Sequence, residues 1–262
     1  MTHQKRPGCA LVTGASGDIG AQIALRLAQD GWNIAVGYAT GIERAEEVAG
    51  RIRECGVSAM PIKIDVTSTT SVDDAFDALE DSLGQVTVLV NNAGIQHVAS
   101  VQDFPPEKWD AILAINLSSA FHTTRLALPH MLRRNWGRII NVASAHGLAA
   151  SAGKSAYVAA KHGLIGLTKA VALENATTGV TCNAICPGWV LTPLVQKQID
   201  DRAAQQGISV QQAQENLLRE KEPSLQFTTP QQLGQMAVFL CSPAADNMRG
   251  IAWANDGGWT AQ

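Results

Sequence analysis

One tyrosine and one lysine of the chain have the spacing that acid–base chemistry requires. Lys161 follows Tyr157 by four positions, so on a helix the two side chains lie on one face, about one turn apart. A free phenol has a pKa of about 10, and a nearby ammonium favours its ionised form. We therefore expect a helix from Ser155 onward, with Lys161 near the phenol oxygen and Tyr157 as a candidate general acid and base.

A glycine-rich turn follows the first predicted strand. Residues 13–20 read TGASGDIG and lead directly into a helical pattern. Glycines at such a turn let the backbone approach a pyrophosphate, and the helix N-terminus offers free N–H groups and a positive dipole end. We predict a dinucleotide site here, although an ordinary tight turn is the alternative. The contacting residues expected from this turn are Gly14, Ser16, Asp18 and Ile19.

Polar residues at the ends of later strands extend this predicted site. Asp65 follows the third strand, where its carboxylate can accept a hydrogen bond from an adenine amino group or cap a helix from Thr67 onward. The fourth strand ends in the amide-rich turn NNAG at 91–94, beside the strand ends where open α/β sheets bind ligands. The further cofactor contacts expected are Asp65, Val66, Asn92, Ala93, Gly94, Pro187, Gly188 and Val190.

Seven short apolar runs, many rich in β-branched residues, must position these side chains. Helical spacing fills the segments between the runs, as at Ile19, Ile23 and Leu27. This alternation predicts βαβ units and a parallel sheet covered on both faces. The predicted strands are 9–13, 34–38, 61–64, 86–90, 138–142, 180–185 and 251–254. We therefore expect an α/β chain, a single Rossmann-like doubly wound domain over 1–262 with about seven strands.

The segment from Pro193 to Pro223 departs from this alternation. Two helical patterns rich in Gln and charged residues follow one another there without a strand between them. Such an insertion can be a helical lid over a site. A surface helical hairpin is the alternative.

Composition excludes several classes of protein. The chain has 262 residues, with 20 Lys and Arg against 23 Asp and Glu, so it lacks the basic excess that nucleic acid or an anionic membrane attracts. No spanning helix or signal segment is apparent, which predicts a cytoplasmic protein. The five scattered cysteines fit reduced thiols. Cys182 and Cys186 fit a strand core better than half of a metal site, and no metal site is predicted.

These motifs together resemble the short-chain dehydrogenase/reductase family along nearly the whole chain. The resemblance rests on the glycine turn, NNAG, Asn116, Ser144 and Tyr157-x-x-x-Lys161. It implies that Tyr157 is the general acid and base and that Ser144 orients the substrate oxygen. It also implies that Lys161 lowers the phenol pKa and holds ribose hydroxyls, and that Asn116 supports a relay water. A core amide satisfied by backbone is the alternative for Asn116. A homotetramer is a further implication.

Three positions depart from the family pattern. Asp18 occupies the place of a usual glycine, and Gly17 comes one position early. The acidic residue that often marks NAD preference is missing from 37–40, and Leu191 stands where a basic residue is expected. No Arg or Lys lies at 15–18 or 37–41 to neutralise a ribose 2′-phosphate, and Asp18 can repel one. The sequence therefore favours NAD as cofactor.

Longer strings resemble one group within that family, the bacterial D-3-hydroxybutyrate dehydrogenases, which oxidise (R)-3-hydroxybutyrate to acetoacetate with NAD. The strings are NNAGIQH at 91–97, GRIINVASAHG at 137–147, KSAYVAAKH at 154–162, NAICPGW at 183–189 and DGGWTAQ at 256–262. A small anion needs a cation with amide and imidazole donors, and its alkyl end needs an apolar wall. The resemblance implies a carboxylate held by Gln96, His146, Lys154 and Gln198, with Trp189 and Trp259 around the methyl end.

Each of these substrate residues also has an ordinary structural interpretation, as a surface amide, a solvated lysine, a loop histidine or a core tryptophan. Two rival functions are an NADPH-dependent 3-oxoacyl reductase of the same family and a non-catalytic nucleotide-sensing protein. A carrier-linked thioester needs an open channel, and a sensor needs no proton relay through Ser144, Tyr157 and Lys161.

Overall fold

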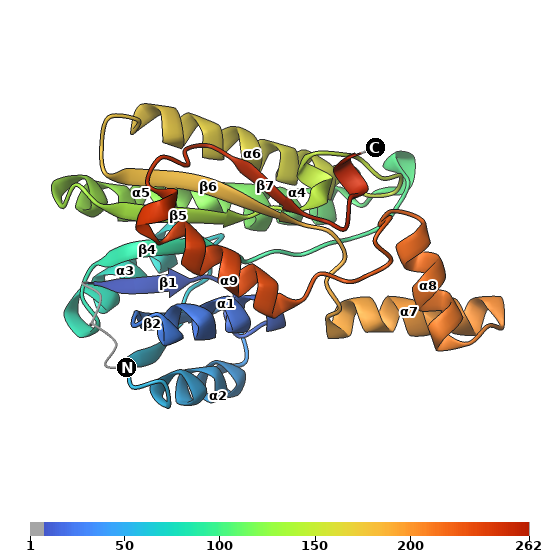
Figure 1. Ribbon diagram of the computed structural model, residues 1–262, viewed down its shortest axis with the longest axis horizontal. Coiled ribbons are helices and arrows are strands. Elements are labelled where there is room, and N and C mark those ends of the chain that lie inside the picture. The colour runs from blue at the N-terminus through green and yellow to red at the C-terminus, as the bar shows by residue number, and fades with distance from the viewer. Residues whose placement is uncertain (1–7, 262) are drawn as a thin grey trace.

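A parallel sheet organises the computed structural model, which describes residues 8–261. The strands are β1 (Cys9–Val12), β2 (Asn33–Tyr38), β3 (Ala59–Lys63), β4 (Val86–Asn91), β5 (Gly137–Val142), β6 (Val180–Pro187) and β7 (Ala252–Asn255). They pair in parallel in the order β3-β2-β1-β4-β5-β6-β7 (Figure 1). The predicted doubly wound parallel sheet is thus confirmed. Gln262, the last residue of the DGGWTAQ string, lies outside the described residues.

Helices cover both faces of the sheet. They are α1 (Asp18–Gln29), α2 (Ile42–Arg53), α3 (Thr69–Ser82), α4 (Pro106–Leu113), α5 (Ser119–Arg133), α6 (Ser155–Glu174), α7 (Pro193–Gln206), α8 (Val210–Arg219) and α9 (Pro230–Leu240). Alternate residues of β1 serve two cores, because strand side chains alternate between faces. Ala10 and Val12 pack with α1, α2 and α9, whereas Cys9 and Leu11 pack with α3, α5 and α6.

The strand order reverses between β1 and β4. The chain runs outward from β1 to β3 and then crosses back to place β4 on the other side of β1, and ligands bind at such switch points. Buried amides link the layers here. Asn91 Nδ2 donates to Asn141 Oδ1 at 2.8 Å, and the Thr123 hydroxyl donates to Asn91 Oδ1 at 2.7 Å. These bonds hold the carboxyl ends of β4 and β5 in register.

The two helices predicted in the segment 193–223 are both present. Each starts at a side-chain cap, Thr192 before α7 and Ser209 before α8, as short hydroxyl side chains favour. The helices pack on one another through a small apolar cluster that includes Ile199 and Leu217. They project from the body of the molecule, at the right of Figure 1.

The described cysteines and helices agree with two further expectations. Cys182 and Cys186 are fully buried within β6, as predicted for core residues. All five cysteines are free thiols. Among residues 8–261, no helix combines the length and the apolar character that crossing a bilayer needs.

Candidate functional site

Two loops at the switch point are joined by hydrogen bonds. The Thr13 hydroxyl oxygen accepts from the backbone N–H groups of Asn92 and Ala93, at 3.0 and 3.1 Å. The Asn92 side-chain amide donates back to the carbonyl oxygens of Thr13 and Gly14, at 2.9 and 3.2 Å. The glycine turn and the NNAG turn therefore form one rigid wall at the carboxyl ends of β1 and β4.

A groove of about 480 Å³ runs along this wall. Gly14 has a φ of +63°, which L side chains rarely adopt, and a Cβ on Gly20 would lie 2.6 Å from the Gly14 carbonyl oxygen, so both positions favour glycine. The bare backbone leads into the N-terminus of α1, which favours a phosphate. The lining residues fit a nicotinamide dinucleotide. Nine of the predicted cofactor residues line the groove: Gly14, Ser16, Asp18, Ile19, Asp65, Val66, Asn92, Ala93 and Gly94.

Asp65 lines that groove after β3. Its Oδ1 accepts from the Thr67 N–H at 2.9 Å and from the Thr67 hydroxyl at 2.7 Å. These bonds lower the pKa of Asp65, because they favour the charged carboxylate. The predicted alternative of a helix cap was wrong in detail, since Ser68 is the N-cap of α3. Asp65 makes a local turn with Thr67 instead, because its carboxylate is two residues from that N–H.

Tyr157 and Lys161 occupy one face of α6, as the four-residue spacing predicts. The Lys161 Nζ atom donates to the Val142 carbonyl oxygen at 2.8 Å and lies 5.6 Å from the centre of the Tyr157 ring. Burial raises the pKa of Tyr157, and a hydrogen bond with Ser144 acts in the opposite direction. Burial also lowers the pKa of Lys161 to about 8. The pKa of Tyr157 thus shifts in the direction opposite to the one expected from Lys161, because burial is the larger effect and Ser144 is the neighbour that opposes it.

Ser144 and His146 are joined at the end of β5. The Ser144 Oγ accepts from the His146 backbone N–H at 3.1 Å, and the imidazole Nδ1 lies 3.4 Å from the same oxygen. The imidazole Nε2 lies 3.0 Å from the Ser151 hydroxyl. Burial, with the nearby charges of Lys154 and Lys221, lowers the pKa of His146 to about 3. The imidazole is therefore neutral at physiological pH.

A cavity of about 220 Å³ lies in front of Tyr157. Two indoles wall it. His146 packs edge-on against Trp259 at 4.7 Å between ring centres, and the Lys154 ammonium lies 4.8 Å from the centre of the Trp189 ring. The predicted residues that line it are Ile19, Asn92, Gly94, Gln96, Ser144, His146, Lys154, Tyr157, Lys161, Pro187, Gly188, Trp189, Val190 and Trp259.

Two predicted site residues lie outside both cavities. Gln198 is on α7 and half-buried, one turn beyond Val195, which does line the cavity. Asn116 is buried in a π-helical turn over Ala114–Ser118, where its side chain exchanges hydrogen bonds with the backbone of Ile95 at 2.9 and 3.0 Å. The contacts of Asn116 are therefore those of an amide whose hydrogen bonds are satisfied by the backbone, which was the alternative interpretation. Its place in a π-helical turn is typical of functional sites.

Comparison with known proteins decides the family. The family model described as "short chain dehydrogenase" matches residues 8–203. The chain belongs to the short-chain dehydrogenase family. It is 56% identical to the D-beta-hydroxybutyrate dehydrogenase of Cupriavidus necator, over 97% of this chain and 98% of the relative. It is 46% identical to the D-beta-hydroxybutyrate dehydrogenase of Rhizobium meliloti, over 97% and 98%.

The fold agrees with a solved structure of similar size. The chain superposes on the crystal structure of an actinorhodin polyketide ketoreductase variant with NADPH, with a TM-score of 0.91 and 34% identity over 97% of this chain and 98% of that one. The predicted family and its Rossmann-like sheet are therefore confirmed, and this short-chain dehydrogenase is an oxidoreductase.

Sequence reasoning missed three charged residues of this short-chain dehydrogenase that contact cavity-lining residues. Arg44 of α2 reaches Asp18, with Nη2 and Oδ1 3.5 Å apart. The Lys221 ammonium lies 5.4 Å from the centre of the Trp259 ring. Neither Lys154 nor Lys221 forms an ion pair within the described part of the chain. Local inspection of 15–18 and 37–41 could not find Arg44, because tertiary packing brings it to Asp18.

The third missed residue, Glu222, is fully buried behind Trp189. Its Oε1 accepts from the Trp189 backbone N–H, while its Oε2 has no hydrogen-bond partner among the described residues. Burial raises the pKa of Glu222 to about 7. In the sequence it is one of many charged residues in a helical segment, so no local signal marks it.

Proposed function

We propose that this short-chain dehydrogenase oxidises (R)-3-hydroxybutyrate to acetoacetate, reversibly and with NAD. The arrangement that carries the proposal is a small cavity with Ser144 and Tyr157 at one wall and the ammonium of Lys154 at another, closed by two indoles. Its volume of about 220 Å³ is below the ~300–1,000 Å³ of sites for drug-sized ligands. A short hydroxy acid matches that size and charge better than a long acyl chain.

The cofactor would lie between the two cavities. The glycine turn and the N-terminus of α1 would hold its phosphates, Asp65 and Val66 its adenine, and Lys161 its ribose hydroxyls. The nicotinamide would reach Pro187, Gly188 and Val190 at the carboxyl end of β6. When bound, a nicotinamide dinucleotide supplies the acceptor for the hydride that leaves carbon 3 of the substrate.

The chain's own residues move the proton and hold the substrate. Ser144 donates a hydrogen bond to the substrate hydroxyl oxygen, and the Tyr157 phenolate accepts the hydroxyl proton. The buried ammonium of Lys161 stabilises that phenolate, since opposite charges in a dry site favour one another. Asn116 holds the loop at Ile95 from which a relay water reaches Lys161.

The carboxylate lies between the donors of the opposite wall. Lys154 supplies charge, and Gln96 and the neutral His146 supply hydrogen bonds. Trp189 and Trp259 enclose the methyl group. The segment 193–223 acts as a lid, and its closure brings Gln198 of α7 to the carboxylate and excludes water.

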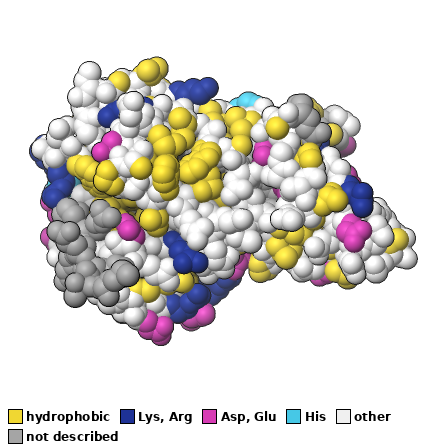
Figure 2. All heavy atoms as spheres, in the orientation of Figure 1, with side chains coloured by type: hydrophobic (Ala, Val, Ile, Leu, Met, Phe, Trp, Pro, Cys, Tyr) yellow, Lys and Arg dark blue, Asp and Glu magenta, His cyan; other side chains and the backbone are white. Residues whose placement is uncertain are grey.

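We expect the enzyme to be a homotetramer. Exposed apolar side chains support assembly, among them Phe121 of α5 and Leu173 of α6, which are 52% and 77% exposed. Figure 2 shows hydrophobic side chains gathered over α9 and β7, where Phe239 packs edge-on against Trp253. Mass photometry of the purified protein measures the mass of the assembly and so gives the number of subunits.

The experiment that tests the function is NADH formation from purified protein, NAD and either (R)- or (S)-3-hydroxybutyrate. Turnover with the R enantiomer and NAD, and at most a few per cent of that rate with the S enantiomer, is expected. Acetoacetyl thioesters with NADPH serve as the comparison. A higher kcat/KM for the thioester with NADPH identifies a 3-oxoacyl reductase and overturns the proposal.

A further inference from the structure

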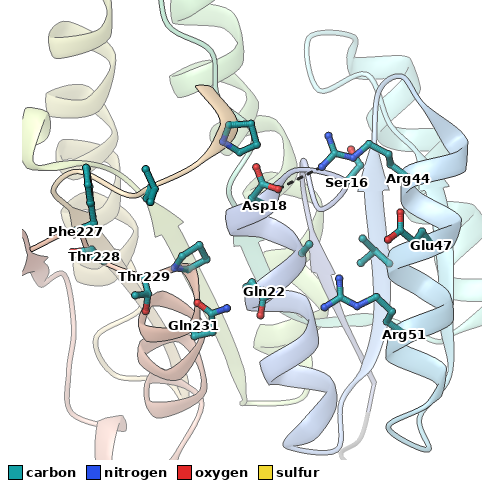
Figure 3. Close-up of a pocket in the computed structure, with 15 residues that line it drawn as sticks. Ser16, Asp18, Gln22, Arg44, Glu47, Arg51, Phe227, Thr228, Thr229 and Gln231 are labelled. Carbon is teal, nitrogen blue, oxygen red and sulfur yellow. Dashed lines mark hydrogen bonds and ion pairs between the residues drawn. The ribbon is translucent and has the colours of Figure 1, made fainter. Parts of the chain in front are cut away.

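A third cavity, of about 550 Å³, adjoins the cofactor groove and is not used by the proposed reaction. It lies between α1, α2 and the start of α9 (Figure 3). Ser16 and Asp18 line both this cavity and the groove. The two spaces therefore meet at the glycine turn and the start of α1.

Asp18 and Arg44 face one another across this junction. Figure 3 shows the Asp18 carboxylate at the start of α1 pointing toward the Arg44 guanidinium of α2, with 3.5 Å between Oδ1 and Nη2. The side chains are 40% and 64% exposed. Exposed ion pairs are weak and screened, so a ligand charge placed here competes with the pair.

The remaining charges of the cavity are balanced. Arg51 lies two turns after Arg44 on the same helix face, and Glu47 lies between them. With Asp18, the wall carries two positive and two negative side chains. Without Asp18 it would carry a net positive charge, with Arg44 unoccupied at the edge of the groove.

The end of β2 normally selects between dinucleotides, by an acidic residue that holds the ribose 2′-hydroxyl or by an arginine that accommodates a 2′-phosphate. Here Ala39 and Thr40 line the groove after β2 and supply neither. We propose that the Asp18–Arg44 pair makes this selection instead. Asp18 occupies Arg44, the arginine at the edge of the groove, and places a negative charge at the junction, so a 2′-phosphate is rejected and NAD is accepted. The inference rests on the proposed function for its cofactor class.

The test is calorimetric binding of NAD, NADP and adenosine 2′,5′-bisphosphate, with no substrate present. Asp18→Asn should lower the Kd of adenosine 2′,5′-bisphosphate, and the ratio of the NADP Kd to the NAD Kd, at least about tenfold, the size of one charge-assisted contact. Arg44→Gln added to Asp18→Asn should remove this gain. Glu43→Gln, on α2 but outside the cavity, is the control and should change neither.

Three results would overturn the inference: an unchanged ratio of NADP to NAD affinity in Asp18→Asn, a gain that persists in the double variant, or an equal gain in Glu43→Gln. Asp18→Ser repeats the test if Asp18→Asn unfolds at a lower temperature than the parent. Because binding is measured without substrate, an enzyme that fails to oxidise 3-hydroxybutyrate still gives a clear answer.

Discussion

The Lys161 ammonium is anchored to the Val142 carbonyl oxygen by a 2.8 Å hydrogen bond. This bond joins the second turn of α6 to Val142, the last residue of β5, which lies two positions before Ser144. The positions of the candidate base and of the serine are therefore fixed relative to one another by the lysine as well as by packing.

Replacing Lys161 by Gln should separate its anchoring from its charge. An amide can still donate toward Val142, but the buried phenolate of Tyr157 loses its stabilising cation. We expect kcat to fall about a hundredfold and the rising limb of the pH–rate profile to move up by at least about one unit, equivalent to ~1.4 kcal/mol. A profile with an unmoved limb would assign Lys161 a purely structural role.

Replacing Tyr157 by Phe should remove the proton acceptor and leave the cavity shape intact. General acid–base groups contribute typically about 10²–10⁴-fold, so turnover should fall by that factor while NAD binding changes less than about twofold. The other tyrosine, Tyr38 in β2, is buried outside both site cavities, and Tyr38→Phe is the matched control. Equal turnover in Tyr157→Phe and the parent would exclude the mechanism.

Lys154 and Lys221 should act on the charge of the substrate. The two ammoniums flank His146 and lower its pKa together, and neither has a carboxylate partner within residues 8–261. Lys154→Met should raise KM for 3-hydroxybutyrate about 10–100-fold and Lys221→Met by a smaller factor. KM for a neutral ester of the same hydroxy acid should stay within about twofold. Lys197→Met, on the exposed face of α7, is the control.

Glu222 should make stability depend on pH. Its pKa rises from 4.5 to about 7 on folding, so the folded protein binds more protons between these values and the free energy of unfolding falls as pH increases through this range. Glu222→Gln keeps an acceptor for the Trp189 N–H and should gain up to about 3 kcal/mol at pH 8 but little at pH 4.5. Urea unfolding at pH 8 and at pH 4.5 measures the change in the free energy of unfolding. Glu54→Gln, at an exposed position, is the control.

Trypsin should cleave the proposed lid, the segment 193–223, more slowly when both NAD and substrate are bound. Trypsin sites at Lys197, Arg202 and Arg219 lie on α7 and α8, which project from the body in Figure 1. Closure that brings Gln198 to the site would bury part of this surface, so cleavage should slow at least about fivefold with NAD and substrate together. The same rate in both states would favour a static surface hairpin.

The sheet could be predicted because each strand carries its own signal. Buried parallel strands are continuous apolar runs, and runs such as Val86–Val90 and Val180–Ile185 fall inside the observed β4 and β6. The chemistry of Tyr157 and Lys161 was likewise readable, because a four-residue spacing on a helix fixes relative position without any tertiary information.

Residues that meet through tertiary packing could not be predicted. Arg44 reaches Asp18 across 26 positions, and Glu222 reaches Trp189 across 33. The sign of a pKa shift also needs burial, which is why Tyr157 differs from the expectation. Gln198 shows the converse limit. The family resemblance placed it near the carboxylate, but the orientation of α7 decides whether its side chain reaches the cavity.

The crossing of the chain from β3 back to β1 has a kinetic consequence. The bond from Asn92 N–H to Thr13 joins groups 79 positions apart, and such long-range pairing slows folding. An intermediate in which β1, β2 and β3 have formed, but β4 has not yet docked, has no complete nucleotide groove. Cofactor added during refolding should therefore leave the early phases unchanged and stabilise only the species in which the two halves of the sheet have joined.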